Sequence, residues 1–484
     1  MENIIKKLFL SVSLLILVFS LTSCERDMTS LNNDPKHPNS LKSGNLLASG
    51  QYENFYNMYT GSVNSNNFRF FIQQWTETIY TDETNYNLVT RNQPRTYFTA
   101  MYVRVLNSYA QGQKNLVVEK DTDLENADID IYNNKWAILE LSSIFVWENI
   151  VDTYGDVPYS QALQVETIKS PKYDDAKTIY LDLLKRIDVA IAKIKVGKDS
   201  YGRYDLVYKG DMSKWLKMAN SLKLRLAINL ADVDAATSKT AAESAIASGV
   251  LQSNSDSFTL VFDGGTFTNP LFDDLVASSR NDFLPSDILV DRMNTTSDPR
   301  RAFYFTPLDD GTYKGGIYGI KNSFSKYSHV NPTYLKANAP ANLLSYAEVL
   351  FLQAEAAVRG YNAGGAAATL FNSAITASMQ DNGVASADIA AYTAANPLNM
   401  ANWKQSIGNE AWVALWNNPF GAWNFVRRLD FPALPTPAGS LVGGVPVRMP
   451  YSDREYDVNK VNVTEAANHI GGDKATTKLF WDKY

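Results

Sequence analysis

The sequence predicts a mainly α-helical protein, built from degenerate tetratricopeptide-like helix pairs with long irregular loop insertions and a few short strands. Several segments place apolar residues at helical spacing, and some of these segments follow one another closely, as paired helices do. Two long stretches between them show no periodicity. No clean repeat of about 34 residues is visible, so the pairs are degenerate rather than a regular array.

Three helices are expected in the first half of the chain, at residues 133–151, 176–194 and 212–232. Each carries one apolar stripe at intervals of three or four residues, which is typical of a helix with one buried face. The stripes are Trp136, Leu139, Val146 and Ile150 in the first, Tyr180, Leu183, Leu184, Ile187 and Ile191 in the second, and Trp215, Ala219, Leu222, Leu226 and Leu230 in the third.

Three more helices are expected at residues 345–360, 366–379 and 404–416. Ser345 and Glu348 form a capping-box pattern, in which the hydroxyl and the carboxylate each bind a free backbone N–H. Gly360 is a favoured residue just after a helix end.

Residues 64–94 and 261–340 are the two long insertions, and both are rich in Asn, Tyr, Phe, Gly and Asp. Insertions of this length without strong periodicity tend to carry function.

The amino terminus has the pattern of a lipoprotein signal peptide. Lys6 and Lys7 precede an apolar run at residues 8–21, and the only cysteine of the chain, Cys24, follows at the expected cut. The run is shorter than the roughly 20 residues of a spanning helix. We therefore expect a signal peptide at residues 1–23, a lipid anchor on Cys24, a polar tether at residues 24–44 and a single domain at residues 45–484. The alternative is an ordinary signal peptide with an incidental cysteine.

Charge and motifs exclude several classes of function. The net charge of −6 argues against a nucleic-acid partner, which requires a basic face. The three histidines are scattered, and no zinc-protease, phosphate-loop or nucleophile-elbow motif is present. We therefore expect no catalytic residue, cofactor or metal, although a pair of glycosidase carboxylates stays possible. The acids between residues 121 and 130 fit a solvated loop better than a calcium loop, because Asn126 replaces the required glycine.

Buried arginines are expected to hold the helices together. Arg225 lies within an apolar stripe, and its guanidinium needs a carboxylate such as Glu348 or Glu355 because an unpaired buried charge is costly. Arg427 and Arg428 are interpreted in the same way, as structural residues rather than ligand contacts.

The chain resembles the SusD/RagB family of outer-membrane nutrient-binding lipoproteins, in particular its second, SusD-like branch. The resemblance covers nearly the whole mature length and rests on many short segments in order behind the predicted anchor. They are residues 73–86, 154–159 (YGDVPY), 173–180, 215–225 (WLKMANSLKLR), 298–300 (DPR), 346–356, 423–428 (WNFVRR) and 448–451 (RMPY).

This resemblance implies a non-catalytic protein of degenerate tetratricopeptide-like pairs, anchored to the outer membrane and facing the cell exterior. It also implies a SusC-like TonB-dependent transporter as partner, with oligosaccharide or, in some members, peptide as cargo. A different possibility is a lipid-anchored helical-repeat scaffold that binds a partner protein.

The aromatic supply suits sugar binding, because sugar rings stack on flat side chains while their hydroxyls bind Asn, Asp and Arg. Residues 75–86 interleave both kinds, and the polar segment at Arg280 resembles a family loop near the ligand face. Core and ligand-contact roles stay equally open for Trp75, whereas Ile79 is expected in the core, as are Trp136, Trp147, Trp215 and Trp423. The predicted ligand-binding residues are Trp75, Tyr80, Asp82, Asn85, Tyr86, Arg91, Arg280 and Asn281.

Overall fold

The structure, a computed structural model, describes residues 41–484, of which Ser43–Tyr484 form one compact unit. The predicted signal peptide, Cys24 and the tether as far as residue 40 lie outside the described residues. The first described helix, α2, covers Ser43–Tyr59 and begins just before the predicted domain start at residue 45. Within residues 41–484, no helix combines the length and apolar character that a membrane span requires.

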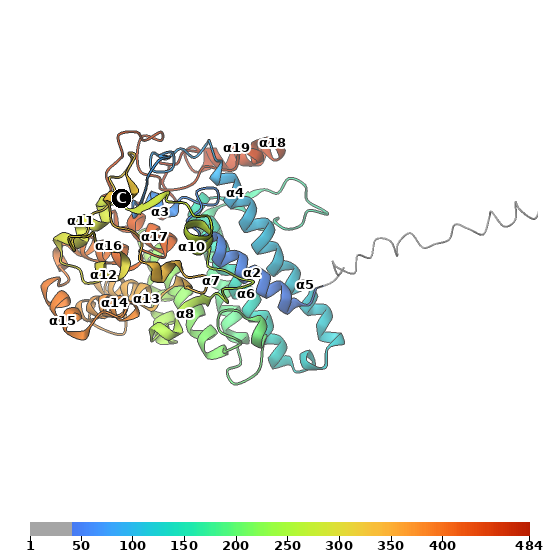
Figure 1. Cartoon of the computed structure of the whole chain (residues 1–484). Coiled ribbons are helices and arrows are strands. Elements are labelled where there is room, and N and C mark those ends of the chain that lie inside the picture. The colour runs from blue at the N-terminus through green and yellow to red at the C-terminus, as the bar shows by residue number, and fades with distance from the viewer. Residues whose placement is uncertain (1–40) are drawn as a thin grey trace, which may run out of the picture. The chain divides into compact units, whose positions relative to one another are not determined.

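The mainly helical class is confirmed, and every predicted helix is present with its ends shifted by a few residues (Figure 1). Residues 133–151 lie within a longer helix, because Asp128 caps its first turn by accepting a hydrogen bond from the Asp130 N–H at 2.9 Å. The observed helices are α6 (Ile129–Tyr154), α7 (Ala176–Lys193), α8 (Met212–Asn229), α13 (Tyr346–Val358), α14 (Ala367–Asp381) and α16 (Trp403–Ala414).

Consecutive helices pack on one another in pairs, as the sequence predicts. Helix α6 contacts α7, α7 contacts α8, and α13 contacts α14. Other helices extend the series: α5 (Asn107–Thr122) packs on α2 and α6, α9 (Ala235–Ala247) on α8, α15 (Ser386–Ala395) on α14, and α17 (Pro419–Leu429) on α16.

Within the described part of the chain, six short strands form three antiparallel two-stranded sheets. Strand β1 (Trp75–Glu77) pairs with β5 (Phe283–Pro285), β2 (Val157–Pro158) with β3 (Tyr173–Asp174), and β4 (Phe258–Val261) with β6 (Pro340–Leu344). The first and third sheets join segments far apart in the sequence and thereby organise the two long insertions.

The remaining helices are short and belong mostly to the insertions and the carboxy-terminal part. They are α3 (Phe68–Phe71), α4 (Gln93–Thr99), α10 (Pro270–Phe272), α11 (Asp287–Thr295), α12 (Arg301–Tyr304), α18 (Asp453–Val458) and α19 (Lys460–His469), with π-helical turns at Ala100–Leu106 and Asp273–Ala277 and 3-10 turns at Leu124–Ala127, Gly202–Tyr204, Asn254–Asp256, Phe324–Lys326, Pro332–Leu335 and Met400–Asn402.

The predicted capping box at α13 forms only in part. The Ser345 hydroxyl accepts a hydrogen bond from the Glu348 N–H at 3.0 Å, as expected. The Glu348 carboxylate, however, binds the Arg225 guanidinium at 3.1 Å instead of turning back to the cap. A buried cation therefore outcompetes the local backbone donor for this carboxylate. Gly360 follows the helix in the left-handed region, at φ 79°, which is the predicted helix-end signal.

Buried arginines join the helices across the core. Arg225 on α8 contacts both oxygens of Glu148 on α6, the shorter distance being 2.6 Å, as well as Glu348. The prediction of Glu348 as its partner is confirmed, whereas Glu355 pairs with Arg428 instead, at 2.9 Å. All of these side chains are almost fully buried, so their charges are compensated within the protein.

Arg427 is also structural, but it binds backbone oxygens and an aromatic ring. It donates to the carbonyl of Asp152 at 2.5 Å, and its guanidinium lies 3.6 Å from the centre of the Trp423 ring. Trp147, Trp215 and Trp423 are buried as predicted. Trp136 is only half-buried and packs at the edge of the core beneath Lys193.

Candidate functional site

Strands β1 and β5 bring the two predicted binding segments side by side. Glu77 lies opposite Phe283 in the sheet, and the Thr78 N–H donates to the carbonyl of Asp282 at 2.9 Å. The Thr78 hydroxyl also donates to the carbonyl of Asn281 at 2.8 Å. The loop that follows Trp75 and the polar segment around Arg280 therefore form one continuous surface.

This surface contains a small hollow, here called the loop pocket, with a volume of about 240 Å³. Three of the predicted residues line it: Tyr80, Arg91 and Arg280. Tyr80 is 53% exposed, and the exposed Arg280 forms an ion pair with Asp282. The other lining residues are Ser62, Val63, Asn64, Glu77, Asp273, Asp274, Ser278, Asp282 and Phe283.

Two buried carboxyl groups lie beneath the loop pocket. Arg91 donates from Nε to Oε1 of Glu83 at 2.7 Å, so part of its hydrogen-bonding capacity is already used. Glu77 accepts from the N–H and the hydroxyl of Thr84, at 3.0 and 2.9 Å. Burial, together with the neighbouring Glu83 carboxyl, raises the pKa of Glu77 to about 9. Glu77 thus keeps its proton at neutral pH.

Two predicted ligand residues, Trp75 and Tyr86, are enclosed by protein and have no exposed surface. Trp75 packs between the Arg69 guanidinium, 4.7 Å from its ring centre, and the ring of Phe283. The Tyr86 hydroxyl accepts from the Gln73 amide at 2.8 Å. Their burial is a correction to their predicted role, because a ligand cannot reach either side chain in this structure. Ile79, expected in the core, is instead 56% exposed.

The other predicted residues do not line the loop pocket. Asp82 accepts from the Asn87 amide at 2.9 Å and stays partly exposed. Asn85 donates to the carbonyls of Thr81 and Gly319, at 2.8 and 2.9 Å, and so fixes the loop. Asn281 is exposed next to Arg280.

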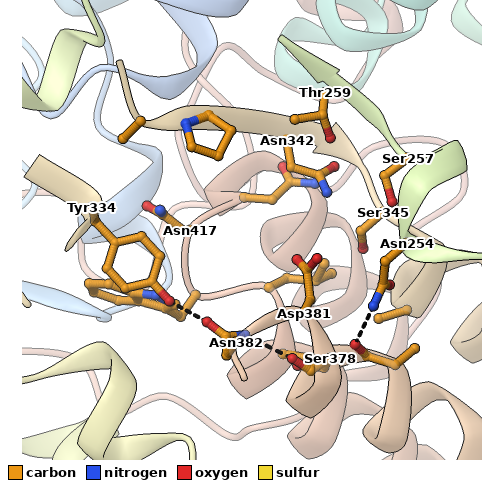
Figure 2. Close-up of a pocket in the computed structure, with 18 of the residues that line it drawn as sticks. Asn254, Ser257, Thr259, Tyr334, Asn342, Ser345, Ser378, Asp381, Asn382 and Asn417 are labelled. Carbon is orange, nitrogen blue, oxygen red and sulfur yellow. Dashed lines mark hydrogen bonds between the residues drawn. The ribbon is translucent and has the colours of Figure 1, made fainter. Parts of the chain in front are cut away.

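A larger cavity, here called the large pocket, has a volume of about 600 Å³ and was not predicted (Figure 2). It lies between the β4–β6 sheet, the end of α14 and the loop after α16, and part of its wall comes from the insertion at residues 261–340. Its lining includes six asparagines and six aromatic residues: Asn254, Asn331, Asn342, Asn382, Asn417 and Asn418, with Tyr59, Tyr208, Phe303, Tyr304, Tyr334 and Trp416.

Most polar side chains of the large pocket are held by hydrogen bonds (Figure 2). The Asn382 amide donates to the carbonyl of Ser378 at 2.8 Å and accepts from the Tyr334 hydroxyl. Asn254 donates to the carbonyl of Ala377 at 2.9 Å. By contrast, no described residue forms a hydrogen bond or ion pair with the Asp381 carboxylate, which is exposed to the cavity, and partial desolvation by the cavity walls raises its pKa.

A wall of aromatic rings in tilted contact separates the two pockets. Phe283 lines the loop pocket and lies 5.7 Å from Trp75, whose ring centre is 6.4 Å from that of Trp416 in the large pocket. Arg69 fills the space between Trp75 and Tyr59, another residue of the large pocket. Trp75 therefore lies at the centre of this wall and has a structural role.

The described residues offer one group with metal-ligand geometry: Asp156, Asp175 and His469. Asp175 already caps α7, and Asp156 accepts from the Ala176 N–H at 2.8 Å and contacts the His469 ring at 2.6 Å. The acids considered as a calcium loop are used differently, since Asp128 pairs with Lys198 and Glu125 with Lys135.

The chain matches known proteins along most of its length. A family described as SusD-like, starch-binding and associating with the outer membrane matches residues 35–452. A solved structure titled a chitin-binding protein is 26% identical, with a TM-score of 0.79, and the match covers 92% of this chain and all of the other. A SusD homologue from Bacteroides uniformis is also 26% identical, with a TM-score of 0.79 and coverages of 91% and 99%.

A chitin-binding SusD homologue from Flavobacterium johnsoniae is 23% identical, with a TM-score of 0.75 and coverages of 90% and 98%, and shares the fold. No curated protein sequence matches the chain.

Proposed function

Because the chain belongs to the SusD-like family of starch-binding proteins that associate with the outer membrane, we propose that it captures glycans at the cell surface and delivers them to a SusC-like TonB-dependent transporter. Proteins of this family bind carbohydrate and are not catalytic, so the protein is a binding protein and not an enzyme. The observation that carries the proposal is the loop pocket, where two segments far apart in the sequence place an exposed aromatic ring next to charged groups.

The loop pocket offers the groups that a sugar ring needs. Tyr80 presents a ring with more than half of its surface exposed, on which the apolar face of a sugar can stack. Arg280 supplies donors and Asp282 supplies acceptors for ring hydroxyls at the same rim. Asn281, which lies between Arg280 and Asp282 in the sequence, and Asp82, two residues after Tyr80, are kept as further polar partners. We keep these residues, with Arg91, as the proposed ligand contacts.

Glycan is favoured over peptide as cargo because a similar structure at 26% identity is titled a chitin-binding protein. Peptide cargo in the same complex, or a scaffold role, are the alternatives. A binding screen with purified oligosaccharides and with a peptide library separates the three possibilities, because a scaffold would bind neither.

The site is tested with the double variant Tyr80→Ala/Arg280→Ala and the strongest oligosaccharide from the screen. We expect its affinity, measured by calorimetry, to fall by about tenfold or more, since both a stacking face and a charged donor are lost. A matched control is Tyr484→Ala/Arg203→Ala, which removes the same two residue types from exposed positions outside both pockets. Equal loss in both double variants, or no loss in the first, would show that the site is misplaced.

The anchor and the domain arrangement also belong to this proposal: a signal peptide at residues 1–23, acylated Cys24, a tether at residues 24–44 and one binding domain at residues 45–484. Labelled palmitate should enter the protein but not a Cys24→Ser variant, which should also leave the membrane fraction. Purification of the protein from mildly solubilised membranes should recover a β-barrel transporter. Absence of that transporter, with the bait itself recovered, would contradict the partnership.

A further inference from the structure

We propose that the large pocket is a second ligand site, which binds an amino-sugar unit of a glycan through its protonated amine, with Asp381 as the anionic contact. This inference rests on the proposed glycan-binding function but uses different residues from the loop pocket. None of the sequence-predicted ligand residues lines the large pocket.

Asp381 is an acidic residue of the large pocket that forms no ion pair with any described residue. Its side chain points into the cavity from the last residue of α14, toward Asn342 and Ser345 (Figure 2). No described residue donates a hydrogen bond to this carboxylate. The other charged residue in the lining of this pocket, Lys214, donates to the carbonyl of Ser255 at 2.8 Å. Asp381 is exposed to the cavity, so a ligand can reach its carboxylate, and a ligand that carries a positive charge would form there the ion pair that no described residue supplies.

The position of Asp381 on its helix adds to this preference. The carboxyl end of a helix carries partial negative charge, which repels an acidic side chain and attracts a cation. The helix end and the carboxylate therefore produce a negative potential at one point of the cavity. A neutral sugar would gain only hydrogen bonds there, whereas an ammonium group gains an ion pair as well.

The rest of the cavity suits a sugar ring around that amine. Asn342 and Thr259 are paired across the β4–β6 sheet and line the same cavity, and the side chains of both lack hydrogen-bond partners among the described residues. They can bind hydroxyls of the ring. The half-buried ring of Tyr334 forms the opposite side, backed by Trp416 at 5.6 Å, and offers a flat face for stacking and for a cation–π contact.

The test compares three oligomers of equal length by calorimetry on the full mature chain, in mildly acidic buffer: glucosamine, N-acetylglucosamine and glucose. We expect the glucosamine oligomer to bind at least about tenfold more tightly than the other two, because only it carries the cation. Asp381→Asn should remove this difference, and Asp381→Glu should keep part of it, since it retains the charge. The matched control, Asp388→Asn, alters an exposed acid on the neighbouring helix α15 and should change nothing.

Asp381→Asn removes an acidic charge from the carboxyl end of α14, where such a charge is unfavourable, so its thermal midpoint should equal or exceed that of the parent. Salt provides a second readout that needs no variant, because binding through one ion pair should weaken as sodium chloride increases. Equal affinity for all three oligomers, unchanged selectivity in Asp381→Asn, or tighter binding of a lysine peptide than of the glucosamine oligomer would overturn the proposal. The proposed function itself would survive such results if the Tyr80→Ala/Arg280→Ala variant still lost its oligosaccharide.

Discussion

Replacing Arg225 with methionine is the most direct test of how this fold is held together. Methionine has a similar length to the arginine stem but lacks the guanidinium, so the substitution removes charge with little change in packing. In the native protein this guanidinium contacts Glu148 at 2.6 Å and Glu348 at 3.1 Å. The variant therefore leaves two buried carboxyl groups facing each other without a cation.

The cost follows from the burial of all three groups, each at most 2% exposed. Removal of one partner from a buried ion pair typically costs 3–5 kcal/mol, so we expect the free energy of unfolding to fall by about 4 kcal/mol at pH 8. Burial already raises the pKa of Glu148 to about 7 while Arg225 lowers it. Without Arg225 this pKa rises further, so the folded variant takes up a proton more readily and its loss of stability should be smaller at pH 5.

Urea unfolding followed by tryptophan fluorescence at both pH values gives the measurement. The triple variant Arg225→Met/Glu148→Gln/Glu348→Gln should recover most of the loss, because it removes the uncompensated charges. Lys198→Met is the surface control: it breaks a 3.0 Å ion pair with Asp128 whose side chains are 47% and 39% exposed, and should cost less than about 1 kcal/mol. A loss below about 1 kcal/mol in Arg225→Met, or no recovery in the triple variant, would refute the reasoning.

Three further predictions concern Glu77 of the loop pocket, a closely packed glycine and a helix end. As the pH rises from 4.5 to 8, the free energy of unfolding of Glu77→Gln should increase relative to that of the parent by more than about 1 kcal/mol. The reason is that the native pKa of about 9 makes the folded parent hold a proton that the unfolded chain releases. Parallel pH profiles of the two free energies would contradict this. Gly315→Ala should lower the stability of the fold by about 2 kcal/mol in thermal melts, because a Cβ there would lie 2.3 Å from the carbonyl oxygen of Ser286. The control Gly265→Ala, whose Cβ would have its nearest atom at 3.8 Å, should change the stability by no more than about 0.5 kcal/mol. Asp211→Ala should cost about 1 kcal/mol by removing the cap of α8, and unchanged urea unfolding would show that the cap is dispensable.

The helices could be predicted because their signals are local. Leu183, Leu184 and Ile187 lie on one face at helical spacing, and all three are buried in α7. The need of Arg225 for a carboxylate partner followed from the cost of a buried charge, and Glu348 was among the partners named. Glu148 was not, although it is 77 residues away in the sequence and Glu348 is 123, because distance along the chain does not tell which helices pack together. Local patterns show that a partner is needed, and only the packing of helices decides which partner is in reach.

The candidate site was less accessible to sequence reasoning for the same physical reason. Residues 75–86 and Arg280 were both recognised, but their meeting depends on the β1–β5 sheet, which joins distant segments. The mixture of aromatic and polar residues in the first segment did not indicate that Trp75 is buried while Ile79 is exposed to solvent. The large pocket has no local signal, because Tyr59, Asn342 and Asp381 come from three separate elements.

The wall between the two pockets affects how binding data on this protein should be interpreted. Substituting a small residue for Trp75 would not simply delete one ring, since Phe283, Arg69 and Trp416 all rest on it. Both cavities would change shape together, and weaker binding in such a variant would be no proof that the indole touches the cargo. Only substitutions of exposed residues at the rims of the pockets, which leave this wall intact, can show which of the two pockets binds a ligand.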